Sequence, residues 1–261
     1  MQPETIQQIL ELNRQFYQNL AEQFSSTRFR LQPGVQKILH SLPEDARILD
    51  LGCGNGELWR NLGREDFKGE YTGIDFSSDL LRLASLQKPD TPIDSLHATV
   101  HQADYPGSQP KHSNPLFIQQ DLSQDDWDSS LAGKDYNYIL AFSVLHHIPG
   151  KELRLKILKK IHKLLTPNGR FIHSEWQFLD SERLRERIQP WESVGLSSDL
   201  VDFNDFLLDW RHSGYGLRYV HHFSEEELSE LAKDSQFRII ESFRSDGQGG
   251  KLGLYQVWAI V

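Results

Sequence analysis

The chain has 261 residues, of which 38% are hydrophobic and 25% charged, and this composition excludes a globally disordered protein. No apolar run approaches the ~20 residues that cross a bilayer, and the N-terminus MQPETIQQILELNRQFY lacks the apolar centre of a signal peptide. Cys53 is the only cysteine, so neither an intrachain disulfide nor a cysteine-cluster zinc site can form. We therefore expect a soluble protein of the reducing cytoplasm, with no membrane attachment.

The charge of the chain is acidic overall but unevenly distributed. A formal net charge of −9 argues against a general nucleic-acid binder, which usually presents a basic face. Residues 151–187, however, hold ten Lys or Arg against five Asp or Glu. This local excess is compatible with contact to a polyanion, and equally with a solvated helix face.

Hydrophobic periodicity and turn residues predict alternating helices and strands. Helices are expected over 4–24, 33–41, 57–63, 77–86, 151–165 and 224–233, with Ser77 and Ser224 as N-caps and a helical, irregular stretch over 180–212. Strands are expected at RILDL and over 71–75, 116–120, 136–142, 170–175, 237–244 and 252–260.

This order of elements predicts a single α/β domain over 1–261. Alternating strands and helices favour a mostly parallel sheet with helices on both faces, and the turn DGQGG joins the last two strands into a hairpin with one antiparallel strand. Three segments stand outside this pattern. We expect 1–42 to form a helical lid, the proline-rich 87–115 a surface insertion, and 176–222 an insertion that covers the substrate side of the sheet.

A glycine-rich turn, DLGCGNG, follows the first strand and opens a helix. Glycine at 52, 54 and 56 lets a ligand approach the backbone, and the helix N-terminus offers free N–H groups. A dinucleotide fingerprint beginning at Gly52 needs Gly or Ala at position 57, where this chain has Glu57. NAD and FAD are therefore disfavoured, and the triphosphate-binding pattern GxxxxGK[ST] is not found at this turn.

Three carboxylates stand at the ends of successive strands. Asp50 precedes the glycines, Asp75 ends the second strand and Asp121 follows the third. Ligands bind along this edge of a parallel sheet, where an acid can accept hydrogen bonds from ribose hydroxyls or an adenine amino group. Each acid alone can also be a helix N-cap, but the three together point to a nucleoside-containing cofactor.

The series LDLGCGNG, GIDFS, IQQDLS, YILAFSVLHHI and LLTPNGRFIHSEW resembles the class I S-adenosylmethionine-dependent methyltransferases. The resemblance implies their Rossmann-like seven-stranded sheet and S-adenosyl-L-methionine as cofactor. It also implies that the cofactor is held by Tyr17, Arg28, Asp50, Gly52, Gly54, Asp75, Asp121, Leu122 and the backbone near Ala141.

A narrower resemblance appears in FYQNLAEQFSSTRFRLQPGVQKIL, SVLHHIPGKELRLKIL, FIHSEW and LRYVHHFSEEELSEL. These segments are similar to the tRNA wobble-uridine carboxymethyl-ester methyltransferases of the eukaryotic elongator pathway. The similarity implies tRNA as substrate, a role in catalysis for His146 and Arg154, and acceptor contacts for Trp176 and Arg218. Whether a small activator protein is needed stays open.

The chemistry leaves several acceptors open. Methyl transfer needs alignment of the acceptor with the S–CH3 bond, and a carboxylate acceptor needs no general base. A hydroxyl or carbon acid can need one, and His146 or His147 is then the first candidate, although this pair can also simply shape the pocket. An anionic small molecule is the first alternative to tRNA, and a catalytically silent cofactor-binding subunit is the second. No spacing of His, Cys and Asp suggests a metal site.

Overall fold

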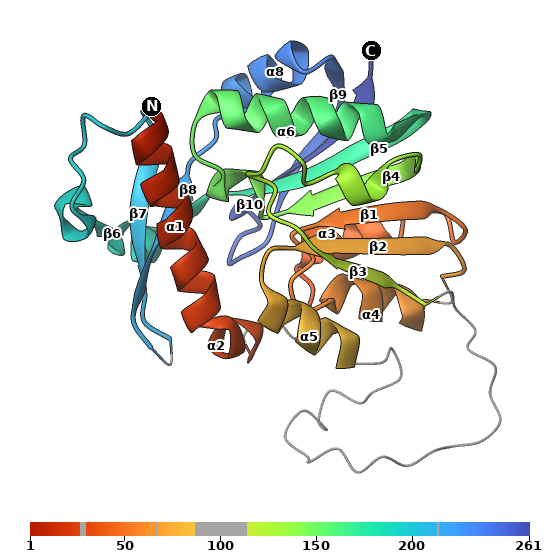
Figure 1. Ribbon diagram of the computed structural model, residues 1–261, viewed down its shortest axis with the longest axis horizontal. Coiled ribbons are helices and arrows are strands. Elements are labelled where there is room, and N and C mark those ends of the chain that lie inside the picture. Colours follow the sequence, from red (N-terminus) through yellow and green to blue (C-terminus); the bar gives the residue numbers. More distant parts are fainter. Residues whose placement is uncertain (27–29, 66, 87–113, 213) are drawn as a thin grey trace, which may run out of the picture.

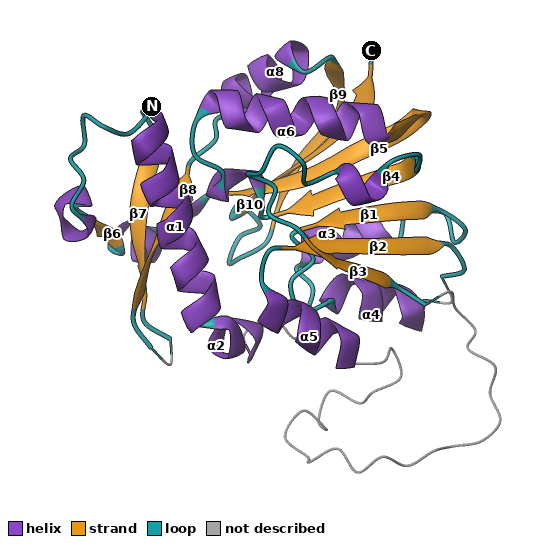
Figure 2. Ribbon diagram, in the orientation of Figure 1, coloured by secondary structure: helices purple, strands orange, loops and turns teal. Residues whose placement is uncertain are grey.

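The computed structural model describes residues 1–26, 30–65, 67–86, 114–212 and 214–261. Its main sheet has seven strands in the order β3-β2-β1-β4-β5-β10-β9. The strands are β1 (Arg47–Leu51), β2 (Glu70–Asp75), β3 (Leu116–Gln119), β4 (Tyr136–Phe142), β5 (Leu165–Trp176), β9 (Phe237–Ser245) and β10 (Gly253–Ile260). Only β10 runs antiparallel to its neighbours β5 and β9, which confirms the expected fold class (Figures 1 and 2).

Helices cover both faces of this sheet (Figure 2). One face carries α3 (Pro33–Leu39), α4 (Glu57–Arg64) and α5 (Ser78–Leu86), and the other carries α6 (Lys151–Leu164) and α8 (Glu225–Asp234). The strands of the centre are buried on both sides, and two apolar clusters form the core, one under α6 and α8 and one under α3 and α4. Burial of apolar side chains on both faces is what a parallel sheet requires.

Local signals fix several helix starts as predicted. The hydroxyl of Ser77 accepts a hydrogen bond from the backbone N–H of Leu80 at 3.3 Å, and the hydroxyl of Ser224 accepts one from Glu227 at 3.1 Å. Proline occupies the first turn of α1 (Pro3–Asn19) and of α3, where its missing N–H costs nothing. The expected helix over 4–24 is divided into α1 and α2 (Ala21–Ser26).

The segment over 180–212 differs from its predicted helical character. It contains a short α7 (Glu182–Arg185) followed by β6 (Ile188–Gln189) and β7 (Asp205–Trp210), which pair with β8 (Gly216–His221) in a second, antiparallel sheet. We call β6, β7 and β8 the inserted sheet. Its face bearing Leu207 and Tyr219 packs on Ile9 of α1, and this long-range contact stabilises strands that local periodicity does not reveal.

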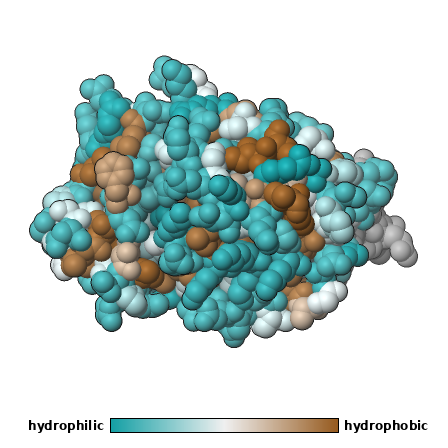
Figure 3. All heavy atoms as spheres, turned by 90° about the horizontal axis from the view of Figure 1, so that it is seen from above, coloured by the Kyte–Doolittle hydropathy of each residue, from teal (hydrophilic) through white to brown (hydrophobic). Residues whose placement is uncertain are grey.

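The predicted surface insertion 87–115 lies outside the described residues except for its last two positions. The face seen in Figure 3 is mainly hydrophilic, with separate hydrophobic patches. On α6, Lys151 and Lys156 form ion pairs with Asp234 and Asp125. Acids therefore offset part of the basic segment 151–187. None of the described helices is both long and apolar enough to span a membrane.

Candidate active site

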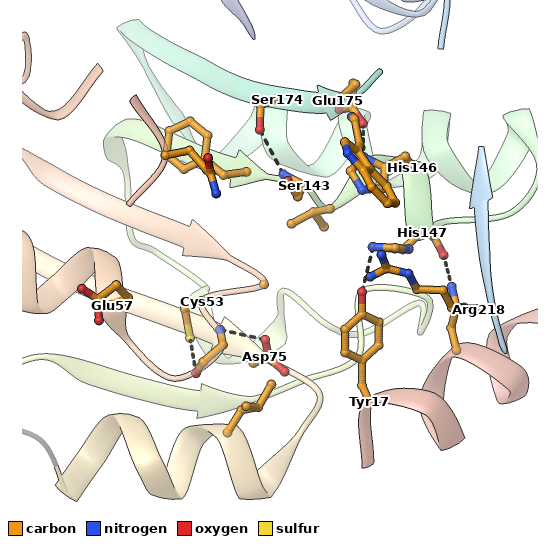
Figure 4. A pocket seen from close by; sticks show the side chains of 18 of the residues that line it. Tyr17, Cys53, Glu57, Asp75, Ser143, His146, His147, Ser174, Glu175 and Arg218 are labelled. Carbon is orange, nitrogen blue, oxygen red and sulfur yellow. Dashed lines mark hydrogen bonds and ion pairs between the residues drawn. The ribbon is translucent and has the colours of Figure 1, made fainter. Parts of the chain in front are cut away.

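A cavity of about 710 Å³ lies where the C-terminal ends of β1, β2, β4 and β5 meet α1 and the inserted sheet (Figure 4). Ligands of open α/β sheets bind at this edge, and small-molecule pockets span roughly 300–1,000 Å³. Ten of the predicted residues line the cavity: Tyr17, Asp50, Gly52, Gly54, Asp75, Asp121, Leu122, His146, Trp176 and Arg218.

The glycine-rich turn forms one wall of the cavity. Gly52 and Gly54 have φ angles of 68° and 55°, a region that L side chains rarely adopt. A Cβ atom on Gly52 would come within 2.7 Å of a methyl group of Val144, whereas one on Gly54 would meet no atom within 4 Å. The backbone at Gly54 therefore borders open space, as close approach of a cofactor requires.

Two buried carboxylates stand beside this turn. Asp75 accepts hydrogen bonds from the backbone N–H groups of Gly54 and Ser77, both at 2.9 Å, and burial nevertheless raises its pKa to about 6. Burial raises the pKa of Asp50 to about 7, although the hydroxyl of Tyr71 donates to it at 2.5 Å. Both acids lie in the cavity wall, where they fit the polar groups of a nucleoside cofactor.

Asp121 and Leu122 continue this wall after β3. Asp121 forms a 2.8 Å ion pair with Arg14 of α1 and accepts a hydrogen bond from the hydroxyl of Ser123 at 2.7 Å. Burial would raise the pKa of Asp121, but the hydrogen bonds from Ser123 and Arg14 hold it below its usual 3.8. The ion pair also joins α1 to this wall of the cavity.

Helix α1 is tied to the other half of the cavity by Tyr17 and Asn13. The hydroxyl of Tyr17 lies 2.8 Å from Nε2 of His147 (Figure 4). The Asn13 amide donates to the carbonyl oxygens of His147 and Tyr219 at 3.2 and 3.3 Å. These contacts, together with the Arg14 ion pair, hold α1 across the cavity, which is the position a lid needs.

The residues at the end of β4 also border the cavity. Ala141 itself lies in the core and does not line the cavity, which is bordered instead by Phe142 and Ser143. Ser143 has a φ of 60°, and its N–H donates to the carbonyl and hydroxyl oxygens of Ser174 at 3.0 and 3.1 Å. A serine in this sparsely populated conformation is a common feature of functional sites.

Arg218 brings a buried cation into the cavity from the inserted sheet. Its side chain is 6% exposed, and its guanidinium carbon lies 5.4, 4.9 and 5.7 Å from the rings of Phe16, Trp176 and Trp210. No acceptor among the described residues faces its Nε, and no carboxylate there forms an ion pair with it. We call Phe16, Trp176 and Trp210 the aromatic cage.

His146 and Glu175 form a buried pair in the cavity wall (Figure 4). Nδ1 of His146 lies 2.9 Å from Oε2 of Glu175, and Nδ1 of His173 lies 2.9 Å from Oε1. All three side chains are at most 1% exposed. The predicted residue His146 thus contacts Glu175, which in turn contacts His173, and the sequence analysis singled out neither of these two residues.

Arg154 corrects one prediction. Its guanidinium lies outside the cavity and donates to the carbonyl of Ile148 at 2.8 Å and to the hydroxyl of Tyr219 at 2.9 Å, with Glu227 at 3.3 Å. These partners join α6 to the inserted sheet and α8, and Arg154 is not among the residues that line the cavity. Arg28, the other predicted arginine, falls outside the described residues.

Several cavity residues escaped the sequence analysis. Arg183, Arg187 and Trp210 line the cavity from a segment whose strands were expected to be helical. The aromatic residues Phe206 and Trp210 of β7 were the available signal for this strand. Among the described residues, no group of three or more His, Cys, Asp or Glu could hold a metal ion.

Known proteins share this chain's sequence and its fold. The putative methyltransferase YqeM of Bacillus subtilis is 27% identical over 217 residues, covering 76% of each chain. A protein of Schizosaccharomyces pombe named tRNA (carboxymethyluridine(34)-5-O)-methyltransferase is 25% identical over 246 residues, covering 88% of this chain and 90% of that one. A SAM-dependent methyltransferase structure from Methanosarcina mazei shares the fold, with a TM-score of 0.60 at 22% identity over 88% of this chain and 98% of that one.

A family model described as a methyltransferase domain matches residues 24–242, which is most of the chain. Its range contains the glycine-rich turn, Asp75, His146 and Arg218, and so spans both walls of the cavity. The chain therefore belongs to the class I S-adenosylmethionine-dependent methyltransferases.

Proposed function

We propose that this enzyme methylates a carboxylate, and that the carboxylate belongs to a modified uridine of tRNA. The observation that carries the proposal is Arg218, a buried cation without an anionic partner among the described residues. Burying an unpaired charge is costly, so its retention beside the cavity calls for an anionic ligand. A planar guanidinium binds a carboxylate through two parallel hydrogen bonds.

The reaction needs little more than alignment. S-adenosylmethionine supplies an activated methyl group, so the O–CH3 bond forms as the S–CH3 bond breaks, the bonding pair stays on sulfur and no proton is released. Arg218 holds the acceptor carboxylate, and α1 excludes water from the cavity through the contacts of Tyr17 and Asn13. The acids near the glycine-rich turn hold the cofactor on the opposite wall.

The aromatic cage and two further arginines favour a nucleotide acceptor. Trp176 and Trp210 are half-buried and line the cavity, where indole rings can contact a base. Arg183 and Arg187 line it as well and form no ion pair with the described residues. They fit the phosphates beside a uridine, and the acceptor named for the Schizosaccharomyces pombe relative is of this kind.

The test is transfer of labelled methyl groups to tRNA and, separately, to an acidic metabolite fraction. We expect tRNA to be labelled, and its binding to weaken with salt, with a log–log slope of about −0.7 to −0.9 per phosphate contact. In the double variant Arg183→Gln/Arg187→Gln, the magnitude of this slope should fall by the equivalent of up to about two phosphate contacts. Arg238→Gln, an exposed residue of β9 outside the cavity, is the matched control.

Two outcomes would contradict the tRNA acceptor. Labelling confined to the metabolite fraction would identify a small carboxylic acid instead. Salt-independent binding of tRNA would show that the arginines do not contact phosphates. Either result would leave the methyltransferase assignment intact, because that assignment rests on the family match over residues 24–242.

A further inference from the structure

Glu175 lies between two imidazole rings beside the cavity. Its Oε2 is 2.9 Å from Nδ1 of His146, and its Oε1 is 2.9 Å from Nδ1 of His173. The carboxyl group is 0% exposed, and the two histidine side chains are 1% and 0% exposed. The protonation states of all three groups therefore depend on hydrogen bonds within the protein and not on bulk water.

The backbone N–H of Trp176 indicates which atoms of His146 and Glu175 carry protons. The N–H of Trp176 donates to Nδ1 of His146 at 3.3 Å, so that nitrogen carries a lone pair and no proton. Oε2 of Glu175 faces the same lone pair, and the contact is a hydrogen bond only if Oε2 carries a proton. A carboxyl group has one proton to give, so Oε1 accepts from Nδ1–H of His173.

We infer that Glu175 is a neutral carboxylic acid that fixes His146 as the Nε2–H tautomer, and that His146 thereby donates a hydrogen bond to the acceptor carboxylate. The inference rests on the proposed function, because a donor suits an acceptor that is already an anion. Glu175 is a positioning residue, since it acts on the acceptor through His146. The chain of donors runs from Nδ1–H of His173 through the carboxyl group of Glu175 to the ring of His146, which lines the cavity.

The surroundings of Glu175 favour its neutral form. Burial raises its pKa well above the usual range, and the charge of Glu227 adds to this, against Arg154 and the backbone of His146, which lower it. Burial also lowers the pKa of His173 to about 3, so this ring is neutral and supplies no cation to hold a carboxylate.

The opposite arrangement would imply a different reaction. An ionised Glu175 would accept from Nδ1–H of His146 and leave Nε2 as a general base, the arrangement that a hydroxyl acceptor requires. In that case the N–H of Trp176 would point at a protonated nitrogen. The 3.3 Å hydrogen bond from Trp176 therefore favours His146 as a donor that binds an anion over His146 as a base that removes a proton.

The tautomers can be read directly in the free enzyme by ¹H–¹⁵N correlation spectra of ¹⁵N-histidine-labelled protein. We expect His146 to be neutral with its proton on Nε2 and His173 neutral with its proton on Nδ1. The signals are assigned through His146→Gln and His173→Gln. A proton on Nδ1 of His146, or a doubly protonated ring near pH 7, would overturn the inference.

Kinetics give a second test that a purely structural role would not satisfy. Glu175→Leu removes both hydrogen bonds and should lower kcat/KM at least ~30-fold. Glu175→Gln supplies one acceptor and one donor in the same places and should recover kcat/KM to within about fivefold, whereas loss of an ionised carboxylate that orients a catalytic histidine can cost about 10⁴-fold. Glu152→Gln, exposed on α6, is the control.

The failure of this inference can be told apart from failure of the proposed function. A product whose methyl group resists mild alkali would contradict the carboxylate acceptor itself. An alkali-labile product combined with a large loss of kcat/KM in folded Glu175→Gln would contradict only the role of Glu175. A rising limb near pH 6.5 in the kcat/KM profile of the wild type, absent in His146→Gln, would likewise show a general base.

Discussion

The guanidinium carbon of Arg218 lies 4.9 Å from the ring of Trp176, whereas no carboxylate among the described residues pairs with it. Cation–π contact partly offsets the loss of hydration but leaves the hydrogen-bonding edge of a guanidinium available. The fold thus places the guanidinium of Arg218 against the ring of Trp176, where it can still bind an anionic ligand.

Replacing Arg218 should separate activity from stability. We expect Arg218→Met to lower kcat/KM for the acceptor about 100-fold, because a charged group that binds a carboxylate is worth roughly 2–5 kcal/mol when its partner is buried. The free energy of unfolding should hold or rise, since the variant removes an unpaired buried charge. Steady-state kinetics and urea unfolding measure the two quantities.

The control for this variant is Arg238→Met, which removes a cation from an exposed position of β9. It should change neither kcat/KM nor cofactor binding. An Arg218→Met enzyme that is strongly destabilised but fully active per folded molecule would mean that the guanidinium supports the fold and does not bind an acceptor.

Asp75 is expected to hold the ribose of the cofactor. Asp75→Ala should weaken binding of S-adenosylhomocysteine by about 1–3 kcal/mol, because it leaves buried hydroxyl groups unpaired. Calorimetry measures this affinity, with Asp79→Ala, an exposed residue of α5, as the matched control. An unchanged dissociation constant in the folded Asp75→Ala protein would remove Asp75 from the site.

Asp50 makes stability depend on pH with a defined sign. Its pKa in the folded chain is about 7, above the ordinary 3.8, so the folded state binds its proton more tightly than the unfolded state. The stability that this proton contributes is present below about pH 4 and is lost as the pH rises toward 7. Asp75, with a pKa of about 6, contributes with the same sign.

The variant Asp50→Asn should remove the contribution of Asp50, because its amide oxygen can still accept from Tyr71. We expect it to be more stable than the wild type at pH 8 by about 1–3 kcal/mol, with a difference that shrinks toward pH 4. Urea unfolding at several pH values measures this. A stability difference that is independent of pH would show that folding does not raise the pKa of Asp50.

The N-terminal helix is proposed to act as a lid. Arg14 and Tyr17 join α1 to both walls of the cavity, through Asp121 and His147. We expect S-adenosylhomocysteine to slow amide exchange in α1, as lids close over bound ligands, and Arg14→Ala to reduce this protection. Gln7→Ala, on the exposed face of α1, is the control. Exchange in α1 that is the same with and without ligand would make it a packing helix only.

The main sheet and the position of the glycine-rich turn with its neighbouring acids at the cavity could be predicted from sequence because their signals are local. Gly52 and Gly54 need positive φ, and each acid follows a short apolar run, so the turn and the strand ends can be read from neighbouring residues. The sequence signal for the hairpin of β9 and β10 was equally local, since its turn contains three glycines.

The part of the cavity formed by the inserted sheet and the end of β5 could not be predicted in the same way. The inserted sheet is stabilised by α1, which is distant in sequence, and Glu175 meets His146 across 29 positions of the chain. Arg154 illustrates the same limit, because its side chain donates to the hydroxyl of Tyr219 and does not line the cavity. Burial and side-chain direction at such positions are decided by tertiary packing.

The carboxylate acceptor is the central claim, and the fate of the transferred methyl group tests it most directly. After transfer from labelled S-adenosylmethionine to tRNA, mild alkali should release the label as volatile methanol, because methyl esters hydrolyse where methyl ethers and methylamines do not. The reaction itself should release no proton in weakly buffered solution. Label that stays on the tRNA after alkali, with one proton released per methyl group, would contradict this account.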